Sequence, residues 1–265
     1  MKSIVFRKKK ISFTDKGKGK VIVLLHGFTE DLHMWDRFAS KLAKKFRVIC
    51  IDLPGHGASE CIAPVHSMDL QAEIVRSVLK ERKVGKCVMI GHSMGGYVTL
   101  AFAEKYKEML NGICLFHSHA FPDSPQDREN RDRVIAIVEK DKFGFVTQFI
   151  TGLFPSEVQL KYKKDIQKLI ERARKFPKEG IIAALEGMKI RPDRTPLLKK
   201  TKLPVLFIIG MKDSKAPLPN LWEMISLPAI SESLILKNCG HMGYIEAPEE
   251  TLNSIWSFAW KTLKN

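Results

Sequence analysis

The sequence predicts an α/β protein: a mostly parallel, doubly wound sheet covered by helices, with a helical lid inserted between two core strands. Short, nearly continuous apolar runs alternate with longer segments of helical periodicity, which is typical of buried parallel strands joined by crossover helices. One stretch, 122–198, keeps the helical pattern but contains no clear buried strand. The chain has 265 residues, 45% of them hydrophobic, and is therefore long enough to form a sizeable single core.

The expected strands fall into two groups. Ile4–Phe6 and Ile11–Phe13 are short, and we expect them to form an antiparallel pair at the sheet edge. The later runs are apolar at nearly every central position, as expected for strands buried on both faces. These runs are Val21–Leu25, Arg47–Ile51, Lys86–Ile90, Gly112–Phe116, Val205–Ile209 and Ser233–Leu236.

Core helices are expected between these strands and after the last one. They are Trp35–Lys44, Met68–Arg82, Met94–Tyr106 and Glu249–Leu263. Pro248 precedes the last of them and suits a first helical turn, where its missing N–H is not needed. Because binding sites in such sheets lie at the carboxyl ends of the strands, the residues that follow each strand are the functional candidates.

The segment without a strand divides the chain into three parts. Residues 1–121 form the first part of the core, 122–198 the lid, and 199–265 the second part of the core. Within the lid the helical patterns are Arg133–Lys142, Phe145–Leu153, Val158–Lys175 and Gly180–Met188. Its large apolar residues are expected mainly to form the lid's own core, and some of them to line an apolar pocket. These are Phe143, Phe145, Phe149, Ile150, Leu153 and Phe154.

The net charge of +15 is concentrated partly in the first twenty residues. This excess indicates a solvated basic edge, because no nucleic-acid-binding module accompanies it. We therefore expect no nucleic-acid partner. The only early apolar run, Ile4–Phe6, is too short for a signal peptide, and no stretch approaches the ~20 apolar residues of a membrane span. No stable membrane insertion is expected.

The five cysteines are odd in number and irregular in spacing, and no two of them form a C-x-x-C pair. This usage is typical of buried thiols in a reducing compartment, so we expect a cytoplasmic protein. It argues against a disulfide framework and against a zinc site.

The strongest motif is Gly91–Gly95, which reads G-H-S-M-G and matches the pattern G-x-S-x-G. It lies between the expected strand Lys86–Ile90 and the expected helix Met94–Tyr106, which is the context of a nucleophile elbow. A sharp turn there presents the Ser93 hydroxyl at the sheet edge, beside the positive end of the helix dipole. Taken alone, the motif could be an ordinary turn of small residues, but the partners below favour Ser93 as a nucleophile.

A serine hydroxyl is a weak nucleophile until a base removes its proton. His241 is the candidate base, because it follows the expected strand Ser233–Leu236 and emerges at the same edge as Ser93. The imidazole needs an acid to fix its tautomer, and Asp213 follows the strand Val205–Ile209. Asp213 could otherwise be a turn aspartate. The chain order serine, acid, histidine is the order expected for this elbow.

An oxyanion hole is expected beside the serine. One donor is the backbone N–H of Met94, directly after the nucleophile. The other should come from the loop after an earlier strand. His26–Phe28 follows the strand Val21–Leu25, so we assign the second donor to the backbone N–H of Phe28.

Five segments together resemble the α/β-hydrolase superfamily and its capped serine hydrolases, which include esterases, lactonases and carbon–carbon bond hydrolases. They are His26–Phe28, Asp52–Ser59, Gly91–Gly96, Gly210–Asp213 and Gly240–His241. The resemblance extends from about Val21 to the C-terminus and implies the α/β-hydrolase fold. It also implies that Asp52 forms a turn and is not the catalytic acid. The serine at 93 speaks against the dehalogenase branch, whose nucleophile is an aspartate.

His117 and His119 follow the strand Gly112–Phe116, and strand alternation would place them on one face. Histidine is a common metal ligand, but no third ligand stands out, so we expect no metal site. Substrate contact is the more plausible functional role for this pair. Otherwise they are polar residues at the lid junction.

The sequence thus predicts a serine hydrolase acting on a small-molecule acyl substrate. A small or medium carboxylic ester is favoured, closely followed by a thioester or lactone. Ser93 would form an acyl-enzyme that water then hydrolyses, without metal or organic cofactor. One alternative is a carbon–carbon hydrolase or lyase that uses the same triad. Another is a non-catalytic small-molecule receptor on the same fold.

Overall fold

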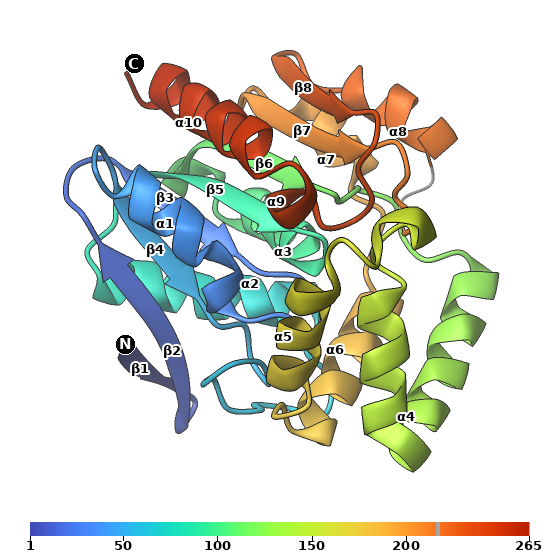
Figure 1. The fold of residues 1–265 in the computed structure, drawn as a ribbon. Helices are drawn as coiled ribbons and strands as arrows, with labels where there is room; N and C mark the ends of the chain where they lie inside the picture. Colours follow the sequence, from blue (N-terminus) through green and yellow to red (C-terminus); the bar gives the residue numbers. More distant parts are fainter. Residues whose placement is uncertain (216–217, 265) are drawn as a thin grey trace.

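The structure, a computed structural model, describes residues 1–215 and 218–264, without the side chains of 218–220. Its centre is an 8-stranded sheet in the order β1-β2-β4-β3-β5-β6-β7-β8 (Figure 1). Strands β1 and β2 pair antiparallel at one edge, and β2 also pairs antiparallel with β4. From β4 to β8 all neighbours are parallel. The predicted fold class, a mostly parallel α/β sheet, is confirmed.

The strand positions agree with the apolar runs, and most differences lie at the ends. The strands are β1 (Lys2–Phe6), β2 (Lys9–Lys16), β3 (Val21–Leu25), β4 (Arg47–Ile51), β5 (Cys87–His92), β6 (Leu110–Phe116), β7 (Val205–Gly210) and β8 (Ser231–Leu236). Strand β5 extends two residues beyond the apolar run, to His92, because its ladder with β6 continues to Phe116. Ladder hydrogen bonds, which hydrophobicity does not reveal, therefore set the strand ends.

Helices cover both faces of the sheet. Helices α1 (Asp36–Leu42) and α10 (Pro248–Lys264) lie on one face, and α2 (Met68–Glu81) and α3 (Met94–Lys105) on the other (Figure 1). The helix expected from Trp35 begins one residue later, because a 3-10 turn, η1 (Leu32–Trp35), precedes it and is capped by the Asp31 side chain. Among the described helices, none is both long enough and apolar enough to cross a bilayer.

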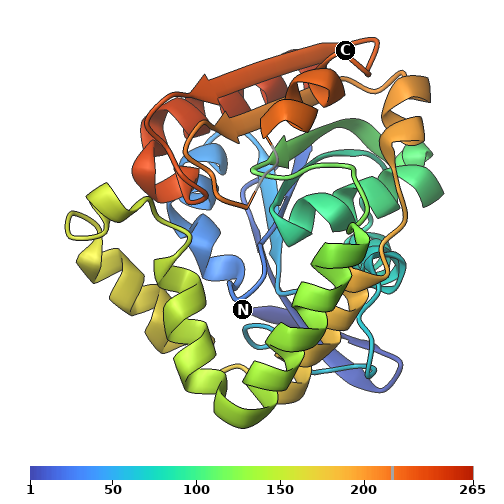
Figure 2. The same ribbon diagram turned by 90° about the vertical axis from the view of Figure 1, so that its right-hand side faces the viewer.

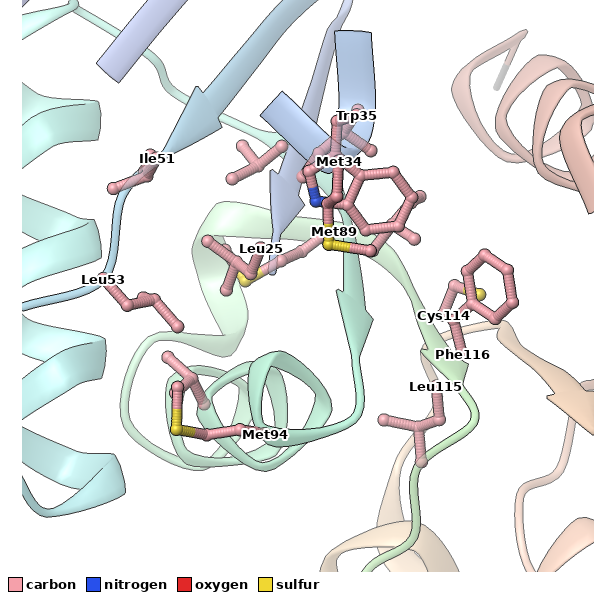
Figure 3. Close-up of a cluster of buried hydrophobic side chains, with 14 of the residues drawn as sticks. Leu25, Met34, Trp35, Ile51, Leu53, Met89, Met94, Cys114, Leu115 and Phe116 are labelled. Carbon is pink, nitrogen blue, oxygen red and sulfur yellow. The ribbon is translucent and has the colours of Figure 1, made fainter. Parts of the chain in front are cut away.

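The core consists of apolar side chains from both faces of the central strands. Figure 3 shows Met34, Trp35 and Met89 gathered on one side of the strands, with Met94 at the start of α3 on the other. Trp35 is completely buried and packs edge-on against Phe38. Burial on both faces explains why these strands are apolar at almost every position.

Three long helices lie between β6 and β7 in the chain and stand together on one side of the core (Figure 2). They are α4 (Pro125–Thr151), α5 (Lys163–Ala173) and α6 (Lys178–Lys189). Helix α4 begins with a capping box at Ser124, and Asp141 inside it has non-helical dihedral angles. The element is therefore two helices joined across a kink, as the sequence predicted, and the first of them begins earlier than the predicted Arg133. A further short helix, α7 (Thr195–Lys200), was not predicted.

The return from this helical insertion to the core is fixed by one buried arginine. The Arg194 guanidinium donates to Asp69 on α2 at 2.9 Å and to Glu104 on α3 at 3.0 Å. Its backbone N–H donates to the carbonyl of Ala120, which lies just before the insertion. The two points where the chain leaves and re-enters the core are therefore joined.

Candidate active site

The turn between β5 and α3 holds Ser93 in a strained backbone conformation. Its φ is +50° and its ψ is −115°, a region that costs a residue other than glycine roughly 1–3 kcal/mol. The turn is possible only because its neighbours are small: a Cβ at Gly91 would lie 2.1 Å from the carbonyl oxygen of Gly95. The backbone N–H of Ser93 donates to Phe116 on β6 at 2.9 Å, which anchors the turn to the sheet.

The structure brings Ser93, His241 and Asp213 together at the carboxyl ends of the strands. The Nε2 atom of His241 lies 2.9 Å from Oγ of Ser93. Its Nδ1 atom lies 2.8 Å from Oδ2 of Asp213. These are hydrogen-bond distances, so the three side chains form a continuous path for a proton. They come from three separate turns, after β5, β7 and β8.

Asp213 is ionised although it is buried. Burial raises the pKa of this carboxyl, but the charge and hydrogen bonds of His241 and His117 outweigh that effect and hold its pKa well below the usual range. The other oxygen, Oδ1, accepts the backbone N–H of Lys215 at 2.8 Å. The carboxylate thus has a fixed orientation, with Oδ2 directed at the imidazole.

The backbone around His241 is held from several sides. Its N–H donates at 3.1 Å to the carbonyl of Leu153, which follows helix α4 of the insertion. The N–H groups of Gly240 and Met242 both donate to the carboxylate of Glu246, at 3.0 Å each. The loop that presents the imidazole is therefore tied to the insertion and to the short helix α9 (Gly243–Glu246).

The residues of the two expected oxyanion donors, Met94 and Phe28, lie at the Ser93 turn and along the same cavity. Met94 is the first residue of α3, so its backbone N–H has no acceptor within the helix. Phe28, on the loop after β3, lines the same cavity as Ser93 and His241.

A cavity of about 560 Å³ opens over Ser93 and His241. One wall is apolar, and there the Phe28 ring meets Phe149 edge-on while Phe145 stacks on Phe149. Other apolar residues of this wall are Val134, Leu185 and Met188. Helices α4 and α6 of the insertion supply most of these side chains, so the insertion closes the cavity over the carboxyl ends of the strands.

The far end of the cavity is polar, and the sequence did not single out its residues. Asp123 pairs with both Arg131 and Arg191. The Arg191 guanidinium lies 4.3 Å from the centre of the Tyr97 ring. No local signal could have identified these residues, because the chain carries 44 lysines and arginines and nothing in their spacing separates Arg191 from the rest.

The two histidines after β6 have different surroundings. His119 lines the cavity, and its Nε2 atom lies 3.1 Å from the Tyr97 hydroxyl. His117 is buried behind the cavity, with Nδ1 3.3 Å from Oδ2 of Asp213. The expectation that both lie on one face assumed an extended strand, but the φ of His117 is +48°, so the alternation ends there. Only His119 is placed where a substrate could reach it.

Asp52 stabilises a turn. Its carboxylate accepts the backbone N–H of Leu32 at 2.8 Å and that of Ala58 at 2.9 Å. This agrees with the part that the resemblance implied for it.

Within the described part of the chain, no cluster of three or more His, Cys, Asp or Glu side chains is arranged to hold a metal ion. The five cysteines are free thiols.

Several buried histidines make the stability of the protein depend on pH. Burial lowers the pKa of His56 and His119 to about 3 and that of His66 and His117 to about 4, from 6.5. As the pH falls below 6.5, these four histidines therefore become protonated in the unfolded chain but remain neutral in the folded protein. The free energy of unfolding should fall between pH 7 and pH 4, by about 1.4 kcal/mol per pH unit for each such proton.

Urea unfolding followed by circular dichroism at pH 7, 6 and 5 measures this slope. His119→Gln removes one of these histidines and should reduce the slope by about 1.4 kcal/mol per pH unit. Equal stability at pH 7 and pH 5 would contradict the prediction.

The sequence and the structure of this chain are both similar to those of known proteins, and the matches include hydrolases of one fold. A family described as the alpha/beta hydrolase fold matches residues 20–248. A thermophilic esterase from Thermogutta terrifontis, solved with malate bound, is 34% identical with a TM-score of 0.91, over 96% of this chain and 94% of that one. A 2-hydroxy-6-oxononadienedioate/2-hydroxy-6-oxononatrienedioate hydrolase from Escherichia coli (strain K12) is 27% identical, over 88% of this chain and 84% of the relative. The enol-lactonase from Burkholderia xenovorans LB400 shares the fold at a TM-score of 0.89, with 20% identity and both chains fully covered.

Proposed function

This chain belongs to the α/β-hydrolase family, and from that premise we propose that it is a serine hydrolase that cleaves small or medium carboxylic esters. The observation that carries the proposal is the path from Oγ of Ser93 through the His241 ring to Asp213, with distances of 2.9 and 2.8 Å. The path opens into a cavity with an apolar wall, as expected for a site that binds an acyl chain.

The proposed reaction proceeds through an acyl-enzyme. His241 removes the Ser93 proton as the oxygen attacks the ester carbonyl, and the backbone N–H groups of Phe28 and Met94 stabilise the oxyanion. The protonated His241 then gives its proton to the departing alcohol. In the second half, His241 takes a proton from the water that attacks the acyl group, and then returns it to Oγ of Ser93 as the bond to the acid breaks. Asp213 stays ionised and stabilises the imidazolium throughout.

The helices from 122 to 198 would act as a lid and set substrate selectivity. This is supported by Phe145, Phe149 and Met188, which belong to the insertion and line the cavity beside Ser93. The apolar wall suits the acyl chain of an ester, and a thioester or lactone would meet the same groups. The esterase from Thermogutta terrifontis, at 34% identity, also favours ester chemistry.

A carbon–carbon bond hydrolase is the second candidate. It is favoured by the Escherichia coli relative, whose name gives 2-hydroxy-6-oxononadienedioate as its substrate. The same three side chains would then promote cleavage between a ketone carbon and its neighbour.

A substrate panel separates the two candidates. We expect p-nitrophenyl esters of graded acyl length to be hydrolysed at a kcat/KM within the ordinary enzyme range, at least about 10⁴ M⁻¹s⁻¹ for the best ester. A vinylogous diketone should react at least about a hundredfold more slowly, a difference of about 2.8 kcal/mol in barrier. The opposite order would favour the second candidate, and tight binding of substrate analogues without turnover would indicate a receptor. Activity should persist in EDTA, and its loss would contradict a metal-free mechanism.

The compartment that we propose is the cytoplasm. Its support is the state of the thiols: all five cysteines are free, and burial raises the pKa of Cys50 and Cys87 to about 12. Such thiols need no oxidising environment and react slowly with disulfides.

A further inference from the structure

Directly behind Ser93 lies a buried pair of charged side chains that the proposed reaction does not use. Nδ1 of His92 lies 2.8 Å from Oε2 of Glu30, and the two side chains are only 1% and 3% exposed. The two residues are 62 positions apart in the chain. A buried ion pair costs desolvation energy and is weak evidence for stability, so its position beside the site needs another explanation.

The neighbours of the pair fix its protons. The other ring nitrogen of His92, Nε2, lies 2.9 Å from the backbone carbonyl oxygen of His241. A carbonyl can only accept, so Nε2 must carry a proton. Apart from His92, Glu30 accepts the N–H of Gly27 at 2.9 Å and the Tyr244 hydroxyl at 2.7 Å. These two donors favour the ionised carboxylate, which can only accept from Nδ1 of His92. His92 is therefore an imidazolium that donates from both nitrogens.

The two ends of this pair reach the two loops of the proposed site. Glu30 binds the N–H of Gly27, the residue directly before Phe28 and its proposed oxyanion donor. His92 binds the carbonyl of His241, the proposed base. The contact is close, because a Cβ at Gly27 would lie 2.5 Å from Oε2 of Glu30 and 2.7 Å from Nδ1 of His92. Only glycine fits at position 27 while the pair is in place.

We propose that Glu30 and His92 are positioning residues, a buried carboxylate–imidazolium pair that sets the oxyanion loop and the catalytic histidine at a fixed distance from each other. The inference rests on the proposed function of Ser93 and His241. Neither side chain touches the substrate. Their effect is geometric: displacement of reacting groups by about 1 Å can cost roughly a hundredfold in rate.

The electrostatics of the surroundings agree with this assignment. Burial alone would raise the pKa of Glu30, but the charge and hydrogen bonds of His92 and the Tyr244 hydroxyl bring it to about 2. Burial would lower the pKa of His92, but Glu30, the carbonyl of His241 and the charge of Asp213 raise it. The rings of His241 and His117 also pack against His92, at centroid distances of 5.1 and 6.0 Å.

The test is the variant Glu30→Gln. The amide oxygen can still take the place of Oε2, which His92 and the N–H of Gly27 share, but its NH₂ then faces the Tyr244 hydroxyl. The variant also lacks the negative charge that keeps His92 protonated, and a neutral His92 cannot donate to both the residue at 30 and the carbonyl of His241. We expect kcat on the best ester to fall about a hundredfold, with KM changed less than threefold. In the double variant with His92→Gln, kcat should fall little beyond the worse single variant, because both substitutions break the same link.

The matched control is Asp15→Asn. Asp15 is another buried carboxylate with a pKa of about 2, paired with Arg47 and Arg82 on the edge of the sheet. Asp15→Asn should lower the urea midpoint, as Glu30→Gln does. Its kcat should stay within about twofold of the unchanged enzyme, because Asp15 lies far from the site. If Glu30→Gln loses stability but keeps kcat within threefold, the pair is merely structural and the proposal is overturned.

A second readout does not depend on activity. Nitrogen-15 NMR of the His92 ring should show both nitrogens protonated at pH 7, and Glu30→Gln should abolish that signature. A neutral His92 at pH 7 would overturn the ion pair. Failure of the proposed function has a different result: no turnover of any ester and no covalent labelling of Ser93 in the unchanged protein. In that case the NMR spectrum still decides the state of the pair.

Discussion

Replacing Ser93 with alanine is expected to lower kcat by about 10⁶-fold and to abolish labelling by a fluorophosphonate probe. The size follows from the proposed mechanism, in which no other group can accept the acyl chain. In an enzyme of this kind, removal of the nucleophile leaves only the contribution of the oxyanion hole and substrate binding. The fold should survive, because alanine removes one oxygen from a turn that the surrounding glycines and the β5–β6 ladder already determine.

Mass spectrometry of the labelled protein and steady-state ester hydrolysis measure this effect. The matched control is Ser118→Ala. The Ser118 hydroxyl is close to the same turn and donates to the carbonyl of Ser93 at 2.8 Å, but it has no base beside it. We therefore expect the fluorophosphonate probe to label Ser118→Ala as it labels the unchanged protein. A label that persists in Ser93→Ala would show that the nucleophile is a different residue.

Asp213→Asn is expected to lower kcat by about 10⁴-fold and to leave the fold intact. The structure explains the direction of the effect. One oxygen of Asp213 accepts the N–H of Lys215 at 2.8 Å, so the amide of the variant must keep its oxygen there and turn its NH₂ toward Nδ1 of His241. The imidazole proton would then reside on Nε2 and point at Ser93, and the ring could not accept the serine proton.

The control for this prediction is Asp52→Asn, at a second buried aspartate that follows another strand of the sheet, β4. Its carboxylate accepts only backbone N–H groups, those of Leu32 and Ala58. The variant should therefore lose about 1–3 kcal/mol of stability through one unsatisfied N–H and keep a kcat within about threefold of the unchanged enzyme. Wild-type rates for Asp213→Asn, or a loss in Asp52→Asn as large as 10⁴-fold, would reverse the two assignments.

Features that depend on neighbours in sequence could be predicted. The apolar runs located β3 and β4 at both ends, because burial on two faces requires apolar residues at every position. The turn around Ser93 was recognisable because tight backbone approach requires glycine at Gly91 and Gly95. Asp213 and His241 could be placed beside Ser93 because parallel strands end at a common edge of the sheet.

Features that depend on the end of an element or on a local irregularity were less predictable. The first helix of α4 begins at Pro125 and not at the predicted Arg133, because a capping box at Ser124 sets its start. His117 leaves strand geometry with a φ of +48°, so alternation misplaced its side chain. Hydrophobic periodicity averages over several residues and contains no information about a single dihedral angle.

The sequence by itself determined the parallel sheet, the order of the proposed catalytic residues and the turn that presents Ser93, because each depends on periodicity or on glycine within a few residues. Only the tertiary structure decided that Glu30 faces His92, that Arg191 closes the cavity end, and that His117 supports Asp213 instead of lining the cavity. Those contacts join residues that are distant in the chain. Their partners are chosen by the packing of whole elements, and a buried charge leaves no periodic trace in the sequence.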